Sequence, residues 1–377
     1  SLGLPVKEPV SITPRAALMS SVAHLPAHHA AQAGPVLEQT WRARGLENQS
    51  GANHCFLNVV IQALWNLQSF RKRLLAAPCH LHGDMASAAE TCCYCALRNL
   101  FQEYACSDRD VLPPDVLRKA LSSTYDMQGR FQLGDMEDAT ETVEIILGIL
   151  HACNVSNSFS SCSHNHSSGA APPVPQADFV EEASNFGCHP VCLAHEVFGI
   201  EYVDVSRCSF CGASGEPNVS SGFTYSVYVT ELLECHERCS KALQGTDSFG
   251  SLWQAVHFIP TFTARPNLQQ VLRELCQPGG RKCSECNSRQ TQAMERWLTR
   301  QPRAFMLSLA WPSTKPTREE LSLVVSMLQP RLRMEEIFKT AGMEEAVYSF
   351  RGLVCYSGMH YVALFWCPAR KQWVFFR

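Results

Sequence analysis

Hydrophobic and polar positions divide the chain into a helical first part and a β-rich second part. In the first part, apolar side chains recur at three- and four-residue steps, which predicts one face of a helix. These positions are Phe56, Val60, Ala63, Leu64, Leu67, Phe70 and Leu74. Residues 96–104, 115–124 and 138–151 are also predicted to be helical, the second of them after a Pro-Pro pair that favours a helix start.

In the second part of the chain, apolar and polar residues alternate as they do in β-strands. Predicted strands lie at residues 221–230, 304–311, 352–356, 360–367 and 373–376. Between the two parts, residues 154–176 are rich in Ser, Asn, Pro and Gly, which predicts a loop or a disordered insert. Helices followed by strands indicate an α+β protein with a helical lobe and a sheet lobe.

Composition narrows the class of protein. Of the 377 residues, 46% are hydrophobic and 18% charged, which is enough for a packed core. Residues 1–43, rich in Ala, Pro and Ser, are predicted to be a flexible leader, and residues 44–377 a single folded domain.

A net charge of −3 gives no electrostatic reason to bind nucleic acid. Neither a membrane-spanning run nor a secretory signal is found, so we expect an intracellular monomer, cytoplasmic or nuclear.

Two Cys-x-x-Cys pairs predict a metal site. The chain has 19 cysteines, and in a reducing compartment this spacing is typical of zinc ligands rather than disulfides. Cys208 with Cys211, and Cys283 with Cys286, supply four thiolates for tetrahedral Zn²⁺. The long separation of the two pairs implies strands that run out and back between them. A closed four-thiolate site is structural, because it leaves no open coordination position.

A second set of cysteines and histidines leaves two readings open. Cys92, Cys95, Cys192 and His195 would form a Cys₃His zinc site, with His80 or His82 as competing ligands. The alternative is that these thiols are simply buried.

Cys55 is a candidate nucleophile. It is predicted to lie at or near a helix N-terminus, where the helix dipole and free N–H groups stabilise a thiolate. Asn53 would donate to an oxyanion beside the sulfur, and His360, after a Gly-containing turn and at the start of a strand, would serve as general base. Taken alone, a cysteine in such a setting is more often a buried structural thiol.

The stretch "GLENQSGANHCFLNVVIQALWNL" resembles the Cys box of the ubiquitin-specific proteases, with Asn53, Cys55, Phe56, Asn58, Gln62 and Leu64 on the pattern. Gly45, Leu46 and Asn48 match if the loop before Asn53 is longer than usual. Asp138, Ala139 and Glu141 match a second family box, in which Glu137 replaces a Gln. "SGMHYVALFW" with "WVFF" is similar to the His box, and the paired cysteines to the zinc-bearing fingers. "CFLN", "CALRNLF" and "RFQLGDMEDA" are closest to a divergent branch of the family.

This resemblance implies a papain-like fold with a helical thumb, zinc-bearing β fingers and a β palm. It also implies a deubiquitinase that acts on ubiquitinated proteins and binds ubiquitin between fingers and palm. Cys55 would attack the carbonyl of the isopeptide bond at the ubiquitin C-terminus, with Asn53 at the oxyanion and His360 as base and then acid.

One position departs from the family pattern. The residue after the final Phe is normally Asp or Asn and orients the catalytic imidazole, whereas Arg377 follows Phe376 here. Either the sequence is cut at this point or the orienting acid is lost. The alternative to an active enzyme is therefore a catalytically impaired pseudo-deubiquitinase that still binds ubiquitin.

Overall fold

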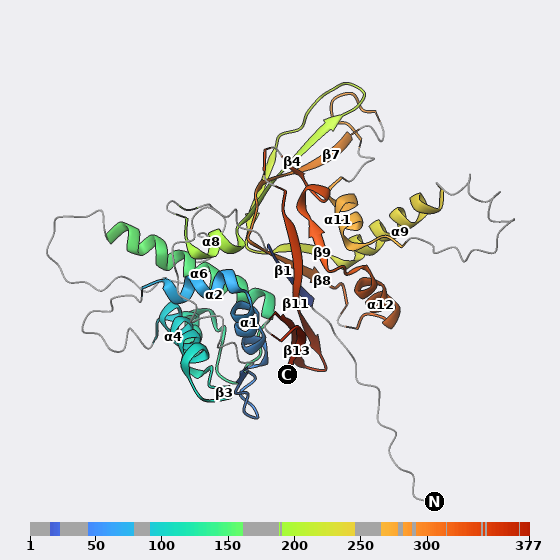
Figure 1. The fold of residues 1–377 in the computed structure, drawn as a ribbon. Coiled ribbons are helices and arrows are strands. Elements are labelled where there is room, and N and C mark those ends of the chain that lie inside the picture. The colour runs from blue at the N-terminus through green and yellow to red at the C-terminus, as the bar shows by residue number, and fades with distance from the viewer. Residues whose placement is uncertain are drawn as a thin grey trace, which may run out of the picture.

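The computed structural model describes residues 16–22, 44–78, 91–160, 188, 191–245, 265–277, 282–288, 292–313, 315–340, 342–343, 345–368 and 370–377. For residues 16–22, 154–160, 244–245 and 292, only the backbone is described. Three regions are visible in Figure 1: a helical lobe, a central sheet and a narrower finger sheet that projects away from the other two.

The helical lobe is formed by the first half of the described chain. Its helices are α1 (Cys55–Asn66), α2 (Gln68–Ala76), α4 (Cys93–Cys106), α5 (Asp115–Thr124), α6 (Ala139–Ser160), α8 (Leu193–Phe198) and the 3₁₀ turn η1 (Asp126–Gln128). A short parallel pair, β2 (Gly45–Leu46) and β3 (Val111–Leu112), closes one end of the lobe.

Two predictions for this lobe need correction. The apolar face predicted as one helix is divided between α1 and α2, because Leu67 adopts an extended conformation between them. The predicted insert at residues 154–176 begins later than expected, since α6 continues to Ser160; residues 161–176 lie outside the described residues.

The central sheet has the strand order β13-β12-β11-β1-β8-β6, with β9 (Arg331–Arg333) paired to β11. Its strands are β6 (Tyr225–Tyr228), β8 (Ala304–Ala310), β11 (Val347–Ser357), β12 (His360–Cys367), β13 (Gln372–Phe376) and β1 (Ala16–Val22). Residues 16–22, within the predicted flexible leader, form β1, which lies antiparallel between β8 and β11. The rest of residues 1–43 lies outside the described residues.

The central sheet separates two hydrophobic cores. Along β8, Ala304 and Met306 belong to the core shared with the helical lobe, whereas Phe305, Leu307 and Leu309 belong to a second core. This alternation follows from the two-residue period of a strand buried on both faces. The second core is covered by α9 (Val229–Gly245), α11 (Leu268–Cys276) and α12 (Arg318–Met327), on the opposite side of the sheet from α1 and α6 (Figure 1).

The strand predicted at residues 221–230 is interrupted. Strand β5 (Asn218–Gly222) ends the finger sheet, β6 begins three residues later in the central sheet, and α9 starts at Val229. Helices α11 and α12 lie within the part predicted to be strand-rich, and each begins with a capping box, at Asn267–Gln270 and Thr317–Glu320 respectively. Such reciprocal caps satisfy free N–H groups and fix the helix starts.

The finger sheet has the order β10-β7-β4-β5, from β10 (Lys339–Thr340), β7 (Gln292–Arg300), β4 (Ile200–Cys208) and β5. Between β9 and β10 the chain makes the 3₁₀ turn η3 (Met334–Glu336). A bidentate ion pair joins β4 to β7, with Arg296 Nε and Nη2 at 2.6 and 2.7 Å from the Asp204 carboxylate. The same guanidinium lies 4.4 Å from the Tyr202 ring centroid. The ladder between β4 and β7 is thus held by charge as well as by backbone hydrogen bonds.

Among the described residues, no helix is both long and apolar enough to cross a membrane.

Candidate active site

Cys55 is the first residue of α1, and its side chain is buried. The preceding residue, His54, is the N-cap and makes no side-chain cap. No acidic residue lies in the first turn. The positive end of the α1 dipole and the free N–H groups at Cys55 are therefore not offset by a carboxylate in the first turn of the same helix.

The polar residues that follow Cys55 hold the chain leading into α1. Asn58 Nδ2 donates to the carbonyl of Glu47 at 3.1 Å, and Gln62 Nε2 donates to the carbonyl of Arg44 at 2.7 Å. From the other side, the backbone N–H of His54 donates to Asn48 Oδ1 at 2.9 Å. These three bonds, made by Asn48, Asn58 and Gln62, fix the turn that precedes Cys55.

Asn53 occupies a left-handed backbone conformation, with φ of 50°, which asparagine tolerates better than most residues. Its exposed side chain donates from Nδ2 to the carbonyl oxygen of Gly134 at 2.7 Å. The amide predicted to donate to an oxyanion is therefore already bonded to a backbone oxygen of the neighbouring loop.

The same loop covers the thiol. Cys55 Sγ lies 3.8 Å from Met136 Sδ. Glu137 holds the loop by accepting a hydrogen bond from the Phe131 backbone N–H at 2.8 Å, and the buried Arg118 donates to the Asp135 carbonyl at 2.8 Å. Residues 134–136, which we call the capping loop, thus contact both Asn53 and Cys55.

His360 begins β12 directly after a two-residue turn. Gly358 and Met359 both have positive φ, at 59° and 62°, the conformation of a type I′ hairpin. The next residue, Tyr361, donates from its hydroxyl to Asp138 Oδ2 at 3.2 Å, and Asp138 Oδ1 in turn caps α6 by accepting from Thr140 N–H at 2.9 Å. Asp138, predicted from the second family box, therefore links the start of α6 to the histidine strand.

Helix α1 packs against β12, so the elements carrying Cys55 and His360 are neighbours. The two side chains, both within the described residues, are not hydrogen-bonded to each other. Burial and, secondarily, the positive charge of Arg377 lower the pKa of His360 below its ordinary value of 6.5. The imidazole is therefore predominantly neutral at pH 7, the form that accepts a proton.

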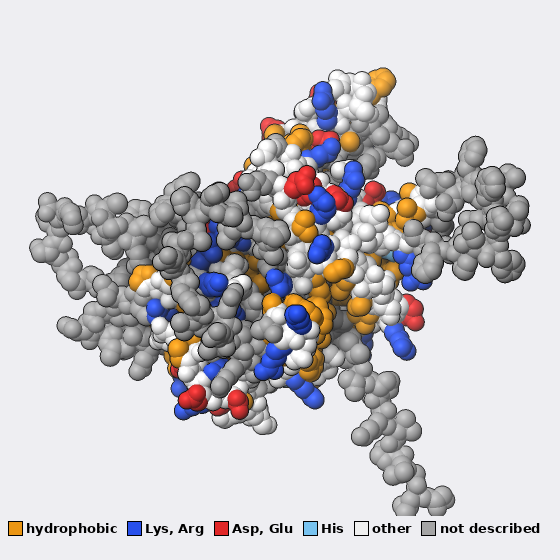
Figure 2. All heavy atoms as spheres, viewed as in Figure 1, with side chains coloured by type: hydrophobic (Ala, Val, Ile, Leu, Met, Phe, Trp, Pro, Cys, Tyr) orange, Lys and Arg blue, Asp and Glu red, His pale blue; other side chains and the backbone are white. Residues whose placement is uncertain are grey.

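A cavity of about 360 Å³ lies beside the thiol. Asn48, Cys55 and Gln62 line one wall, and the other is formed by Tyr361, Phe376 and Arg377 at the ends of β12 and β13. Near these strands, Figure 2 shows exposed hydrophobic side chains beside Lys and Arg; Trp373 and Phe375 are exposed on β13. Arg377 thus brings a positive charge to the position where the family pattern has an acid.

The four cysteines of the two Cys-x-x-Cys pairs come together at the end of the finger sheet. Cys208 Sγ lies 3.7 Å from Cys286 Sγ, Cys211 Sγ lies 3.7 Å from Cys283 Sγ, and all four sulfurs are within 4.8 Å of one another. A tetrahedral zinc with Zn–S bonds of about 2.3 Å requires sulfurs about 3.8 Å apart. The residues therefore fit the metal, which would join the end of β4 to the turn before β7.

The second predicted set is not brought together. Cys192 and His195 lie with His151 and Cys188, whereas Cys92 and Cys95 lie at the start of α4. A hydrogen bond from Cys95 lowers the pKa of the Cys92 thiol. His80 and His82 lie outside the described residues. The spacing Cys-x₃-Cys-x₂-His would have pointed to Cys188, while His151 carries no local sequence signal.

Comparison with known proteins identifies the family. Residues 44–377 match the family model of the ubiquitin carboxyl-terminal hydrolases. The chain belongs to this family. It is 27% identical over 344 residues to ubiquitin carboxyl-terminal hydrolase 54 of Rattus norvegicus, a match that covers 89% of this chain and 18% of the relative. It is 29% identical to ubiquitin carboxyl-terminal hydrolase 53 of Homo sapiens, covering 88% and 27%. The chain therefore spans less than a third of the length of these relatives.

Among solved structures, the SAGA DUB module of Ubp8, Sgf11, Sus1 and Sgf73 bound to monoubiquitin shares the fold, with a TM-score of 0.52 and 15% identity. The match covers 89% of this chain and 63% of that chain. These comparisons confirm the resemblance to the ubiquitin-specific proteases and the α+β fold of helical thumb, β fingers and β palm, which are the helical lobe, finger sheet and central sheet.

Proposed function

We propose that the chain is a cysteine-type deubiquitinase in which Cys55 is the nucleophile, His360 the general base and Asn53 the oxyanion donor. The observation that carries this proposal is the position of Cys55 at the start of α1, lining a cavity whose opposite wall is built from the strands that follow His360. A thiol at a helix N-terminus, with a neutral imidazole on the adjacent strand, is the arrangement that cysteine hydrolases require.

The reaction divides into acylation and deacylation. His360 takes the proton of the Cys55 thiol, and the thiolate attacks the carbonyl carbon at the C-terminal glycine of ubiquitin. The tetrahedral oxyanion accepts a hydrogen bond from Asn53. The C–N bond then breaks, His360 gives its proton to the departing lysine amine, and a thioester remains. Water attacks the thioester, loses a proton to His360 and releases ubiquitin as the thiol is reprotonated.

The capping loop must move before this sequence starts. Asn53 Nδ2 donates one of its two hydrogens to Gly134 in the resting structure, and the second is the one proposed to reach an oxyanion. Met136 must leave Cys55 before a substrate carbonyl can reach the buried sulfur. Binding of the ubiquitin tail along the cleft supplies the free energy for this change.

Ubiquitin is the proposed partner, held between the finger sheet and the central sheet by the monomeric protein. The four-thiolate cluster of Cys208, Cys211, Cys283 and Cys286 would hold a structural Zn²⁺, which has no open position for catalysis. We place the protein in the cytoplasm or nucleus, where thiols stay reduced.

A ubiquitin probe with a C-terminal propargylamide tests the activity, because it forms a covalent bond only with a reactive active-site cysteine. We expect labelling of the protein at Cys55, loss of labelling in Cys55→Ala, and full labelling in the matched control Cys106→Ala, which removes an exposed thiol. Binding of unmodified ubiquitin is measured in parallel by fluorescence anisotropy.

Arg377 at the triad-acid position favours a second candidate, the impaired pseudo-deubiquitinase. Retained ubiquitin binding without labelling of Cys55 would establish that candidate and overturn the first. Neither binding nor labelling would overturn both.

A further inference from the structure

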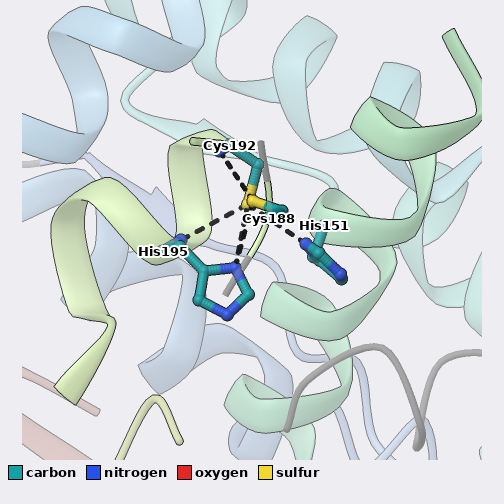
Figure 3. Close-up of side chains that lie close together, drawn as sticks. All are labelled: His151, Cys188, Cys192 and His195. Atoms are coloured by element: carbon teal, nitrogen blue, oxygen red, sulfur yellow. Dashed lines mark hydrogen bonds between the residues drawn. The ribbon is translucent and has the colours of Figure 1, made fainter. Parts of the chain in front are cut away.

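A second cluster of metal-ligating side chains lies in the helical lobe, away from the finger sheet. It consists of His151 from α6, Cys188, and Cys192 and His195 at the start of α8 (Figure 3). All four side chains are buried, and their ligand atoms lie within 4.8 Å of one another. Two thiols and two imidazoles are a common ligand set of structural zinc sites.

The separations between the sulfur and nitrogen atoms of these side chains agree with tetrahedral coordination of a metal. His195 Nδ1 lies 3.3 Å from Cys192 Sγ and 3.5 Å from Cys188 Sγ, and His151 Nδ1 lies 3.4 Å from Cys192 Sγ. Around a zinc with Zn–S of about 2.3 Å and Zn–N of about 2.0–2.1 Å, a sulfur and a nitrogen are separated by about 3.5 Å. The three measured separations agree with this value.

Backbone N–H groups point at the two sulfurs. The N–H of Cys192 lies 3.0 Å from Cys188 Sγ, and the N–H of His195 lies 3.4 Å from Cys192 Sγ. Hydrogen bonds of this kind orient ligand atoms toward a metal. The rings of His151 and His195 meet edge to face at 4.6 Å between centroids, so both imidazoles approach the same point without stacking.

We propose that His151, Cys188, Cys192 and His195 form a second, structural zinc site, distinct from the four-thiolate site of the finger sheet. The metal joins α6, whose first turn is tied through Asp138 to the histidine strand, to α8, whose last residue is followed after one glycine by β4. It fixes the root of the finger sheet to the helical lobe. The ion pair of Arg73 on α2 with Glu196 on α8, at 2.7 Å, supports the same junction from outside.

The experiment measures zinc per chain by plasma mass spectrometry after incubation of the purified full chain with excess zinc sulfate and desalting. Cys188→Ser/Cys192→Ser is expected to lose one zinc equivalent relative to the unmodified chain. The matched control Cys235→Ser/Cys276→Ser, which removes two buried thiols outside both clusters, is expected to lose none. Equal zinc content in the unmodified chain and in Cys188→Ser/Cys192→Ser would overturn the proposal.

Variants at His195 separate ligation from packing. His195→Cys keeps a metal ligand and is expected to retain the zinc equivalent, whereas His195→Leu keeps apolar bulk and is expected to lose it. Equal zinc content in these two variants would show that His195 only packs.

X-ray absorption at the zinc edge of the unmodified chain covers the case in which a variant does not fold. The proposal requires imidazole scattering, because the four-thiolate site alone gives sulfur only. A spectrum with sulfur scatterers alone would overturn it.

Discussion

The sulfur of Met136 lies 3.8 Å from the sulfur of Cys55, while Asn53 donates to Gly134 two residues earlier in the same loop. Two residues of the three-residue capping loop therefore contact Asn53 and Cys55. The resting state is one in which the reactive groups are present but bonded to their own chain.

Met136→Ala is expected to increase the reaction rate of Cys55 with the ubiquitin propargylamide probe. If the sulfur contact stabilises the closed loop by on the order of 1 kcal/mol, removing it raises the rate by about fivefold. Stopped-time labelling followed by intact mass spectrometry measures the rate. Met127→Ala is the control, because Met127 is 94% exposed and touches neither group. Unchanged labelling in Met136→Ala would show that the loop does not limit access.

Asn53→Gly is expected to lower kcat on a fluorogenic ubiquitin amide by about 10²–10³, the usual effect of removing one oxyanion donor. Glycine is chosen because it accepts the φ of 50° at this position without strain. Asn66→Gly serves as a comparison for the loss of an amide from the same region, since Asn66 bonds only to the α1 backbone carbonyl of Gln62. If both variants lose activity equally, Asn53 does not act on the oxyanion.

Arg377→Asp is expected to move the acid limb of the kcat/KM profile to higher pH. Burial and the charge of Arg377 hold the pKa of His360 below 6.5, so the imidazole loses its proton at a lower pH than usual. A carboxylate at position 377 favours the protonated imidazole instead and raises its pKa. Arg331→Asp, on β9, makes the same charge change elsewhere and is expected to leave the limb in place.

The same Arg377 substitution is expected to raise kcat/KM at neutral pH. Loss of the orienting carboxylate costs a serine protease about 10⁴ in kcat, and restoring an acid recovers part of such a loss. Steady-state kinetics from pH 5 to about 9 would measure both effects across the range in which histidine and cysteine titrate. An unchanged rate would show that residue 377 does not face the imidazole during turnover.

Gly352→Ala is expected to destabilise the fold by about 1–3 kcal/mol, the usual cost of overpacking. Gly352 on β11 is paired with Phe365 on β12, and a Cβ at this position would overlap the Phe365 ring. Urea unfolding monitored by tryptophan fluorescence measures the loss. Gly222→Ala is the control, because its Cβ would meet its nearest neighbour at an ordinary 3.6 Å. Phe365→Leu should restore part of the stability of Gly352→Ala.

Much of the fold could be predicted because its signals are local. The boundaries of α5 and β12 follow from a Pro-Pro start and from alternation, and the chain places both where the pattern indicates. The division of α1 from α2 at Leu67 could not be predicted, since Leu67 has no helix-breaking side chain. Strand β1 was not predicted either, because the strands it pairs with are about three hundred residues away along the chain.

In the candidate site, too, only the residues with a local sequence signal could be predicted. Cys55, Asn53 and His360 are recognised by motif, but the capping loop is not, because Gly134 and Met136 act through a backbone carbonyl and a thioether that carry no motif chemistry. Likewise, the Cys-x-x-Cys spacing of Cys92 and Cys95 suggested them as partners of Cys192. The helix that carries His151 was predicted, but its approach to Cys188, Cys192 and His195 is visible only in three dimensions.

Because the central sheet divides the interior into two hydrophobic cores, the two sides of the molecule can unfold locally as separate units. Cys55, Tyr361 and Phe365 share one core, whereas α9, α11 and α12 cover the other. Regions with separate cores commonly open as separate cooperative units in native-state hydrogen exchange. Amides of α11 can then exchange through an opening that leaves Cys55 and His360 in register, so exchange in the second core can proceed without unfolding of the helical lobe.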